Sequence, residues 1–135
     1  MLIVSKCLTG CPCRYDGRSV PVSEIAGLVE RGEAVAVCPE ELGGLPTPRV
    51  PAELQGSGRV MTRDGRDVTR EFVLGAERAL AIAKECGAKK ALLKGKSPSC
   101  GCGRVYDGSF TGTLTEGDGV AAALFKRNGI EVTEV

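Results

Sequence analysis

The sequence predicts an α/β protein with one domain that spans residues 1–135. Short apolar runs typical of buried strands alternate with segments whose apolar residues recur at helical spacing. The length suits a single core, and the hydrophobic content of 42% and charged content of 26% are ordinary for a globular protein. A third observation connects this fold to function, because cysteines follow three of the apolar runs.

The first part of the chain predicts two strands joined by a short helix. Residues 2–5 form a continuous apolar run with β-branched members, as expected for a strand covered on both faces. A loop with glycine and proline follows over residues 7–21. Apolar spacing over residues 22–29 then predicts a helix with Ser23 as its cap. Residues 34–38 form the second strand.

The middle of the chain predicts an excursion from the sheet and then the longest helix. Residues 39–67 carry several glycines and prolines and show no helical period. A small hairpin is expected over residues 59–68. A loop of this length in a compact domain usually carries function. Apolar residues at helical spacing predict a helix between Thr69 and Gly87.

The last part predicts two further strands. Residues 88–93 form the third strand, a glycine-rich loop with a hairpin near 106–114 follows, residues 120–127 form a helix, and residues 130–135 form the fourth strand. Right-handed crossovers then give a Rossmann-like three-layer sandwich with a mostly parallel four-stranded sheet in the order 2-1-3-4. Its connections change direction between the first and third strands, where such sheets bind ligands.

Charge and hydropathy exclude several classes of function. The 18 basic and 17 acidic residues give a net charge of +1, so no global field attracts nucleic acid. No segment resembles a spanning helix or an export signal. The seven cysteines are odd in number and crowded, which disfavours a secreted disulfide framework. The sequence therefore predicts a cytoplasmic protein with reduced thiols and no membrane partner.

Cys7, Cys38 and Cys100 each lie at or just past the end of a predicted strand. Because the carboxyl ends of parallel strands meet at one edge of a sheet, we expect these thiols to converge. With no histidine in the chain, convergent thiolates predict an iron–sulfur or other soft-metal site. Zinc stays open as a competing metal, although the chain has no C-x-x-C pair. Three further cysteines lie in nearby loops and stay open as ligands or disulfide partners: Cys11, Cys13 and Cys102.

The lack of histidine also restricts catalysis, because a general base must then be a carboxylate, lysine, tyrosine or thiolate. Glu40 follows Cys38 by two residues, and Pro39 fixes the backbone between them, so Glu40 is expected to point into the crevice. Three aspartates are interpreted as partners in local Asx-type turns: Asp16, Asp107 and Asp118. Four basic residues are candidates to hold an anion: Arg14, Lys94, Lys96 and Arg104.

Several motifs together resemble one known family. They include Cys-Pro-Glu at residues 38–40, Leu-Pro-Thr-Pro-Arg at residues 45–49 and Ser-Pro-Ser-Cys-Gly at residues 97–101. With shorter matches along nearly the whole chain, they resemble the DUF523 family, which includes thiouracil desulfidases. The resemblance implies a [4Fe-4S] cluster with one iron not bound by protein. The implied cluster ligands are Cys7, Cys38 and Cys100.

The resemblance also implies a reaction, the non-redox removal of sulfur from a thiolated pyrimidine such as thiouracil or 4-thiouridine monophosphate. The products are the oxo-pyrimidine and hydrogen sulfide. The exposed iron would polarise the C=S group as a Lewis acid. Glu40 would take a proton from the attacking water, and Ser97 would relay or donate one. Four residues are expected to contact the substrate: Lys96, Arg49, Ser99 and Gly101.

An alternative interpretation is a non-catalytic binding module in which the cysteines hold zinc or a closed iron–sulfur cluster. Action on thiolated tRNA is disfavoured, because phosphate contacts need clustered basic residues. The expected partner is a small-molecule thiolated pyrimidine or nucleotide. The sequence leaves a monomer and a homodimer open.

Overall fold

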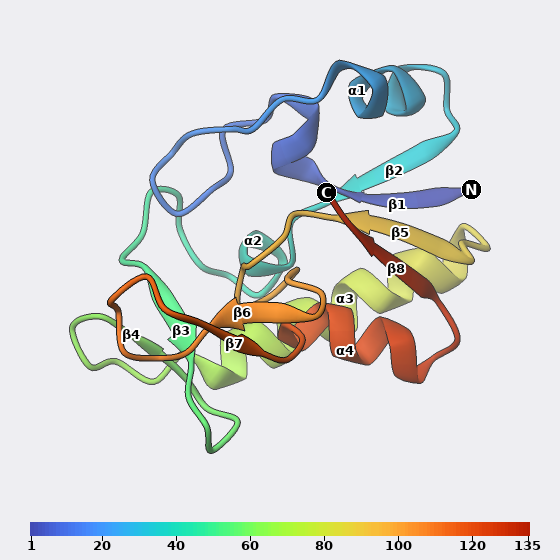
Figure 1. Cartoon of the computed structure of the whole chain (residues 1–135). Coiled ribbons are helices and arrows are strands. Elements are labelled where there is room, and N and C mark those ends of the chain that lie inside the picture. Colours follow the sequence, from blue (N-terminus) through green and yellow to red (C-terminus); the bar gives the residue numbers. More distant parts are fainter.

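A four-stranded parallel sheet lies at the centre of the computed structural model, which describes all 135 residues (Figure 1). Every neighbouring pair of strands runs parallel. Their order is β2-β1-β5-β8, which confirms the predicted order 2-1-3-4. The four strands are β1 (Leu2–Ser5), β2 (Ala34–Val37), β5 (Lys90–Leu93) and β8 (Glu131–Glu134).

Helices cover both faces of this sheet, so the predicted three-layer sandwich is confirmed (Figure 1). On one face, Ile25 of the first helix packs with Val4 and Ala34. On the other face, Phe125 packs with Ile3. The side chains of Ile3 and Val4 thus point to opposite faces of the sheet and pack into different cores, because successive residues of a strand alternate between its faces. The three helices are α1 (Ser23–Glu30) on the first face, and α3 (Thr69–Glu85) and α4 (Val120–Arg127) on the second. None of the helices combines the length and hydropathy needed to cross a membrane.

Short elements gather beyond the carboxyl ends of the central strands. A 3-10 turn, η1 (Lys6–Thr9), follows β1 directly, and a four-residue helix, α2 (Pro39–Leu42), follows β2. Figure 1 shows two small hairpins on the same side of the sheet. They are formed by β3 (Ala52–Leu54) with β4 (Val60–Thr62), and by β6 (Arg104–Tyr106) with β7 (Leu114–Glu116).

One local prediction for residues 39–67 was wrong, and another was confirmed only in part. Helix α2 was not expected, because a single turn is too short to show a helical period. The hairpin predicted over residues 59–68 is present as a narrow turn, in which the Thr62 N–H donates to the Arg66 carbonyl at 2.8 Å and a bridge joins Met61 to Asp67. The longer pairing of β4, however, is with β3. The Arg66 N–H donates to the Thr62 hydroxyl at 2.9 Å, which closes a narrow turn, and α3 begins before a further strand can form.

Helix α2 packs on α3 with backbone against backbone. A methyl group on Gly75 would lie 1.8 Å from the carbonyl oxygen of Pro39. A methyl group on Gly43 would lie 2.0 Å from the carbonyl oxygen of Glu71. Both distances are far below any real contact, so only glycine permits this approach at either position. The contact fixes the chain on both sides of Pro39.

Replacing Gly75 by alanine is expected to destabilise the protein by about 1–3 kcal/mol, because the methyl group overlaps backbone atoms that cannot rotate away. Gly27→Ala in α1 is a matched control, since its methyl group meets only the mobile end of the Arg31 side chain at 3.1 Å. That control is expected to gain about 0.5–1 kcal/mol from helix propensity. Urea unfolding measures both changes, and equal midpoints for the two variants would contradict the close packing.

Candidate active site

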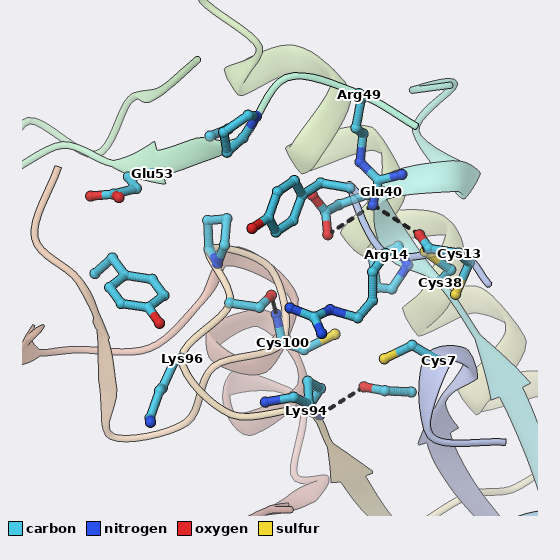
Figure 2. A pocket seen from close by; sticks show the side chains of 18 of the residues that line it. Cys7, Cys13, Arg14, Cys38, Glu40, Arg49, Glu53, Lys94, Lys96 and Cys100 are labelled. Atoms are coloured by element: carbon cyan, nitrogen blue, oxygen red, sulfur yellow. Dashed lines mark hydrogen bonds and ion pairs between the residues drawn. The ribbon is translucent and has the colours of Figure 1, made fainter. Parts of the chain in front are cut away.

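A cavity of about 390 Å³ opens where the carboxyl ends of β1, β2 and β5 lie side by side. Residues that follow these strands form one end of the cavity, and the two hairpins contribute to its walls (Figure 2). The connections of the sheet change direction between β1 and β5. The cavity therefore lies at the position that open α/β sheets use for ligands.

Four of the seven cysteines line this cavity, and Figure 2 shows their side chains gathered at one end of it. Cys7 lies in η1 after β1, Cys38 immediately precedes α2, and Cys100 lies in the loop after β5. The fourth is Cys13, from the loop between η1 and α1. The structure thus brings together the three thiols expected at the strand ends and adds one that the sequence left open.

The other three cysteines lie outside the cavity. The thiol of Cys102 lies 3.7 Å from the carbonyl oxygen of Val132, and the thiol of Cys86 lies 3.5 Å from that of Ala83. Cys11 packs against the small core under α1. All seven cysteines are free thiols, so no disulfide competes for the thiols of the cavity.

Cys13 also belongs to a compact group of possible ligand atoms. Its Sγ, the Sγ of Cys38 and a carboxylate oxygen of Glu41 all lie within 4.8 Å of one another. Glu41 already accepts a hydrogen bond of 2.9 Å from Thr47 and lies 3.9 Å from the ammonium of Lys6. This group has the size for a single ion and differs from the expected trio of strand-end thiols. Soft metals prefer thiolates to carboxylates, and the Glu41 carboxylate is already bonded to Thr47. The three strand-end thiols are therefore the better donor set for an iron–sulfur centre.

Proximity and burial separate the pKa values of the four thiols. Contact with Cys13 lowers the pKa of Cys7 below 9.0, although burial and the nearby Cys100 and Cys38 oppose this. Contact with Cys13 and burial raise the pKa of Cys38 well above the ordinary range. For Cys13 itself, contact with Cys38 lowers the pKa, but contact with Cys7 and burial outweigh it and raise the pKa. Burial raises the pKa of Cys100 to about 12, against a smaller effect of the Ser5 hydroxyl. Cys7 is therefore the first of the four to ionise.

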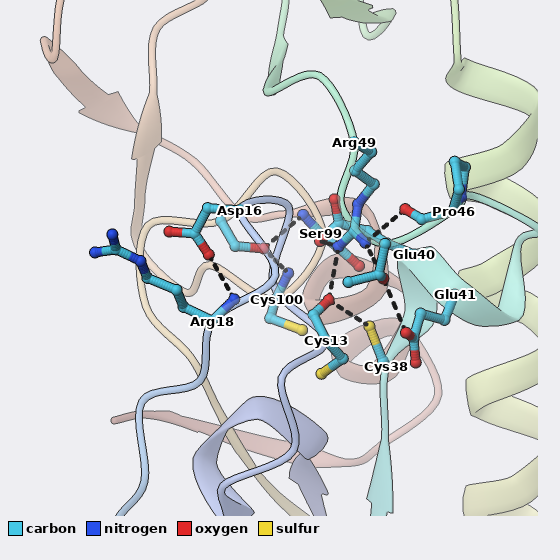
Figure 3. A network of polar contacts seen from close by, with 12 residues as sticks. Cys13, Asp16, Arg18, Cys38, Glu40, Glu41, Pro46, Arg49, Ser99 and Cys100 are labelled. Atoms are coloured by element: carbon cyan, nitrogen blue, oxygen red, sulfur yellow. Dashed lines mark hydrogen bonds and ion pairs between the residues drawn. The ribbon is translucent and has the colours of Figure 1, made fainter.

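Glu40 is held at the cavity by an ion pair with Arg49. The guanidinium lies 3.3 Å from the Glu40 carboxylate, and the two side chains are only 6% and 20% exposed. The same guanidinium donates to the carbonyls of Cys13 and Pro46, both at 3.1 Å, and to the hydroxyl of Thr47 at 2.9 Å (Figure 3). Arg49 was expected to contact substrate. It lines the cavity, but its donors hold Glu40 and the Cys13 loop together, and only its Nε is without a partner.

The loop after β5 places four other candidate residues in two different environments. Ser97 lines the cavity, and its hydroxyl oxygen accepts the N–H groups of Ser99 at 3.0 Å and Cys100 at 2.8 Å, which leaves its own proton free to donate. Lys96 also lines the cavity. Ser99 and Gly101 do not. Ser99 is completely buried, and a methyl group on Gly101 would lie 2.6 Å from the Ser97 carbonyl oxygen. These two residues shape the loop that carries Cys100.

The charged candidates also divide between the cavity and the surface. Arg14 and Lys94 line the cavity, as does Lys96, whereas Arg104 does not. Asp16 and Asp107 accept backbone N–H bonds two residues ahead, so their interpretation as turn residues is confirmed. Asp118 was not correctly interpreted. It accepts bonds from the Gly103 N–H at 2.8 Å and from Lys126 at 3.0 Å, because the β6–β7 hairpin folds back beside α4.

Sequence reasoning missed several residues of the cavity wall. The Ser5 hydroxyl accepts the N–H of Lys94 at 2.9 Å and so joins the ends of β1 and β5. Its place two residues before Cys7 was the one local signal that could have identified it. The other missed residues come from loops and hairpins whose positions no local pattern indicates: Tyr15, Glu53, Arg63, Tyr106 and Phe110.

Comparison with known proteins identifies the family. The 2-thiouracil desulfurase family matches residues 2–135. An uncharacterized protein of Bacillus subtilis (strain 168), YbbK, is 45% identical over 141 residues, which cover 98% of this chain and 93% of that protein. Among solved structures, the chain is similar to TudS, a [4Fe-4S]-dependent thiouracil desulfidase of the DUF523 type. The two chains are 50% identical in sequence, and their structures match with a TM-score of 0.92 over 98% of this chain and 89% of TudS. The chain belongs to the 2-thiouracil desulfurase family, which confirms the resemblance stated above.

The donor set of the cavity fits the cofactor named for TudS. Free thiols from three strand ends meet at one place, and the chain has no imidazole that would favour a zinc or copper site. A carboxylate and several cations complete the walls. The cavity therefore combines soft donors with groups that can move protons and bind anions.

In the metal-free protein, Cys7 is expected to be alkylated faster than the other three cavity thiols. Its pKa is lowered, so at pH 8 more of it is thiolate, which is the reactive form. Cys100, whose pKa is raised to about 12, is expected to react slowest as the pH rises from 7 to 9. Timed iodoacetamide labelling with peptide mass spectrometry measures each rate. Faster labelling of Cys100 than of Cys7 would contradict the arrangement of these thiols.

Proposed function

We propose that this protein is an iron–sulfur-dependent desulfidase acting on thiolated pyrimidines. The reaction exchanges sulfur for oxygen, C=S plus H₂O giving C=O plus H₂S, and it requires no external oxidant or reductant. The observation that carries the proposal is the meeting of free thiols and an ion-paired carboxylate in one cavity, in a member of the 2-thiouracil desulfurase family. A centre that needs reduced thiols also supports a cytoplasmic location.

Cys7, Cys38 and Cys100 are the proposed ligands of a [4Fe-4S] cluster, one from each of three neighbouring strand ends. Three protein thiolates leave one of the four irons without a protein ligand. When bound, such a cluster supplies Lewis acidity toward the soft sulfur of a thiocarbonyl group. Cys13 is proposed to stay outside the ligand set, because a fourth thiolate would occupy the position that the substrate needs.

The remaining residues of the site handle protons. Glu40 is proposed to accept a proton from the water that attacks the thiocarbonyl carbon, and Arg49 orients its carboxylate for this step. Ser97 is proposed to donate a proton, since its lone pairs are already engaged by two backbone N–H groups. The second proton of the water restores the Ser97 hydroxyl, and Glu40 passes on the proton that it accepted, so the net transfer moves both protons of the water to the departing sulfur.

A nucleotide is the proposed form of the substrate. Arg14, Lys94 and Lys96 line the cavity together with Arg63, so several cations are available for a phosphate group. The net charge of the whole chain is only +1, so this positive potential is local to the cavity. Thiolated pyrimidine monophosphates fit this distribution better than a nucleic acid does, because a long backbone needs an extended basic surface.

Replacing Cys7, Cys38 or Cys100 by alanine is expected to prevent formation of a complete cluster after anaerobic reconstitution, because each variant leaves one iron without its protein ligand. Cys13→Ala is the matched control, as it removes a buried thiol from the same end of the cavity. It is expected to keep about four irons and the brown absorption of the parent. Iron analysis and absorption spectra measure both. Loss of the cluster in Cys13→Ala would contradict an open iron and favour a closed cluster, and zinc in place of iron would favour a binding module.

Glu40→Gln is expected to lower kcat for sulfide release from 4-thiouridine monophosphate by about 10²–10⁴-fold, the usual contribution of a general base. The cluster spectrum should stay that of the parent, because Glu40 is not a proposed ligand. Glu41→Gln is the control, since Glu41 is the next residue of α2 and is not part of the cavity wall described above. Its turnover is expected to stay within about twofold of the parent. Full turnover of Glu40→Gln at every pH would show that another group takes the proton.

A further inference from the structure

The wall of the cavity far from the thiols depends on one buried carboxylate. Glu53 of β3 is only 9% exposed, and Figure 2 shows it at the opposite end of the cavity from the cysteines. Its Oε1 accepts the N–H of Gly108 at 2.9 Å and the N–H of Phe110 at 3.2 Å. Both donors belong to the loop between β6 and β7, more than fifty residues away in the chain. Glu53 thus joins strand β3 to the tip of the β6–β7 hairpin.

The loop that Glu53 holds contains a strained residue. Phe110 has a φ of 57°, in the left-handed region that a bulky side chain rarely adopts. Such a conformation persists only where the surroundings impose it, and it often marks a functional position. Here the constraint comes from Glu53 on the Phe110 N–H, and from Gln55, whose amide donates to the Gly108 carbonyl at 3.3 Å. Phe110 lines the cavity as a result.

Phe110 in turn lies beside a cation. The guanidinium of Arg63, from the turn after β4, lies 5.8 Å from the centre of the Phe110 ring, within the range of a cation–π contact. Arg63 and Lys96 both line the cavity. Apart from Phe110 and the glycines, Lys96 is the only residue with a positive φ, which is 69°. The far wall therefore presents an aromatic face and two cations, and the backbone is constrained at Phe110 and Lys96.

We propose that Glu53 is a positioning residue that fixes this wall so that Phe110 and Arg63 recognise the sugar-phosphate end of a nucleotide. The inference rests on the proposed desulfidase function and assigns specificity within it. The two N–H donors partly offset the charge of Glu53, so the carboxylate does not cancel the attraction of Arg63 for phosphate. Because this wall lies away from the thiols, losing it should weaken nucleotide binding and leave the chemical step unchanged.

The test uses the anaerobically reconstituted protein with 4-thiouridine monophosphate and with free 4-thiouracil. Glu53→Ala is expected to raise KM for the nucleotide about tenfold, the effect of losing about 1.4 kcal/mol of binding, with kcat and the cluster spectrum unchanged. KM for the free base should not change. Glu53→Gln is expected to behave like the parent, because its amide oxygen can accept the same two N–H bonds. Equal KM effects on the two compounds, or no effect on either, would overturn the inference.

A second variant covers the case in which Glu53→Ala fails to fold. Arg63→Met removes a cation from an exposed turn of the cavity wall, and Arg59→Met is its control, because Arg59 lies near the same hairpin but outside the cavity. Arg63→Met should raise KM for the nucleotide alone, and Arg59→Met should change neither KM. The inference is wrong if the two arginine variants behave alike.

Two readouts do not depend on turnover. Amide hydrogen exchange at Gly108 and Phe110 should accelerate in Glu53→Ala and stay slow in Glu53→Gln. Calorimetric binding of uridine monophosphate should weaken about tenfold in Arg63→Met. If the parent releases no sulfide from either compound, the proposed function fails, whereas binding and exchange still test the wall. Equal binding of uridine monophosphate to the parent and Arg63→Met would overturn the inference whatever the activity.

Discussion

The site depends on the parallel arrangement of β1, β2 and β5, whose carboxyl ends lie together at one edge of the sheet. The chain leaves β1 toward α1 on one face, and it leaves β2 and β5 toward α3 and α4 on the other face. The segments after these strands therefore separate and leave a cavity between them. Cys7, Cys38 and Cys100 reach that cavity because each follows one of these strands, so the topology of the backbone collects the thiols.

Close backbone contacts then hold the short segments that carry these thiols. Helix α2 sits directly on α3 through Gly43 and Gly75. The Cys100 loop also packs closely on the start of α4, where a methyl group on Gly119 would lie 2.4 Å from the Ser99 carbonyl oxygen. That carbonyl also accepts the N–H of Ala121 at 2.9 Å, which anchors the loop to the helix. In this chain of 135 residues, backbone contacts with α3 and α4 therefore hold the short segments around the site.

The cavity has three parts with different chemistry. One end carries soft thiols, the middle carries the Glu40–Arg49 ion pair, and the far wall carries Phe110 beside Arg63. Thiols suit a metal centre, a carboxylate suits proton transfer, and an aromatic ring beside a cation suits an anionic heterocycle. Under the proposed function, a pyrimidine bound in this cavity would lie between the thiols and the cations of the far wall.

The four strands, their order and the thiols at three strand ends could be predicted from the sequence, because apolar periodicity reports which faces are buried and right-handed crossovers restrict the topology. Three contacts between loops became visible only in the folded chain: Cys13 joins these thiols, Arg49 pairs with Glu40, and Glu53 holds the Phe110 loop. The Arg49 bond to Cys13 spans 36 residues, and the Glu53 bond to Phe110 spans 57. Such contacts form between loops after the sheet has assembled, and no local period in the sequence records which loops will meet.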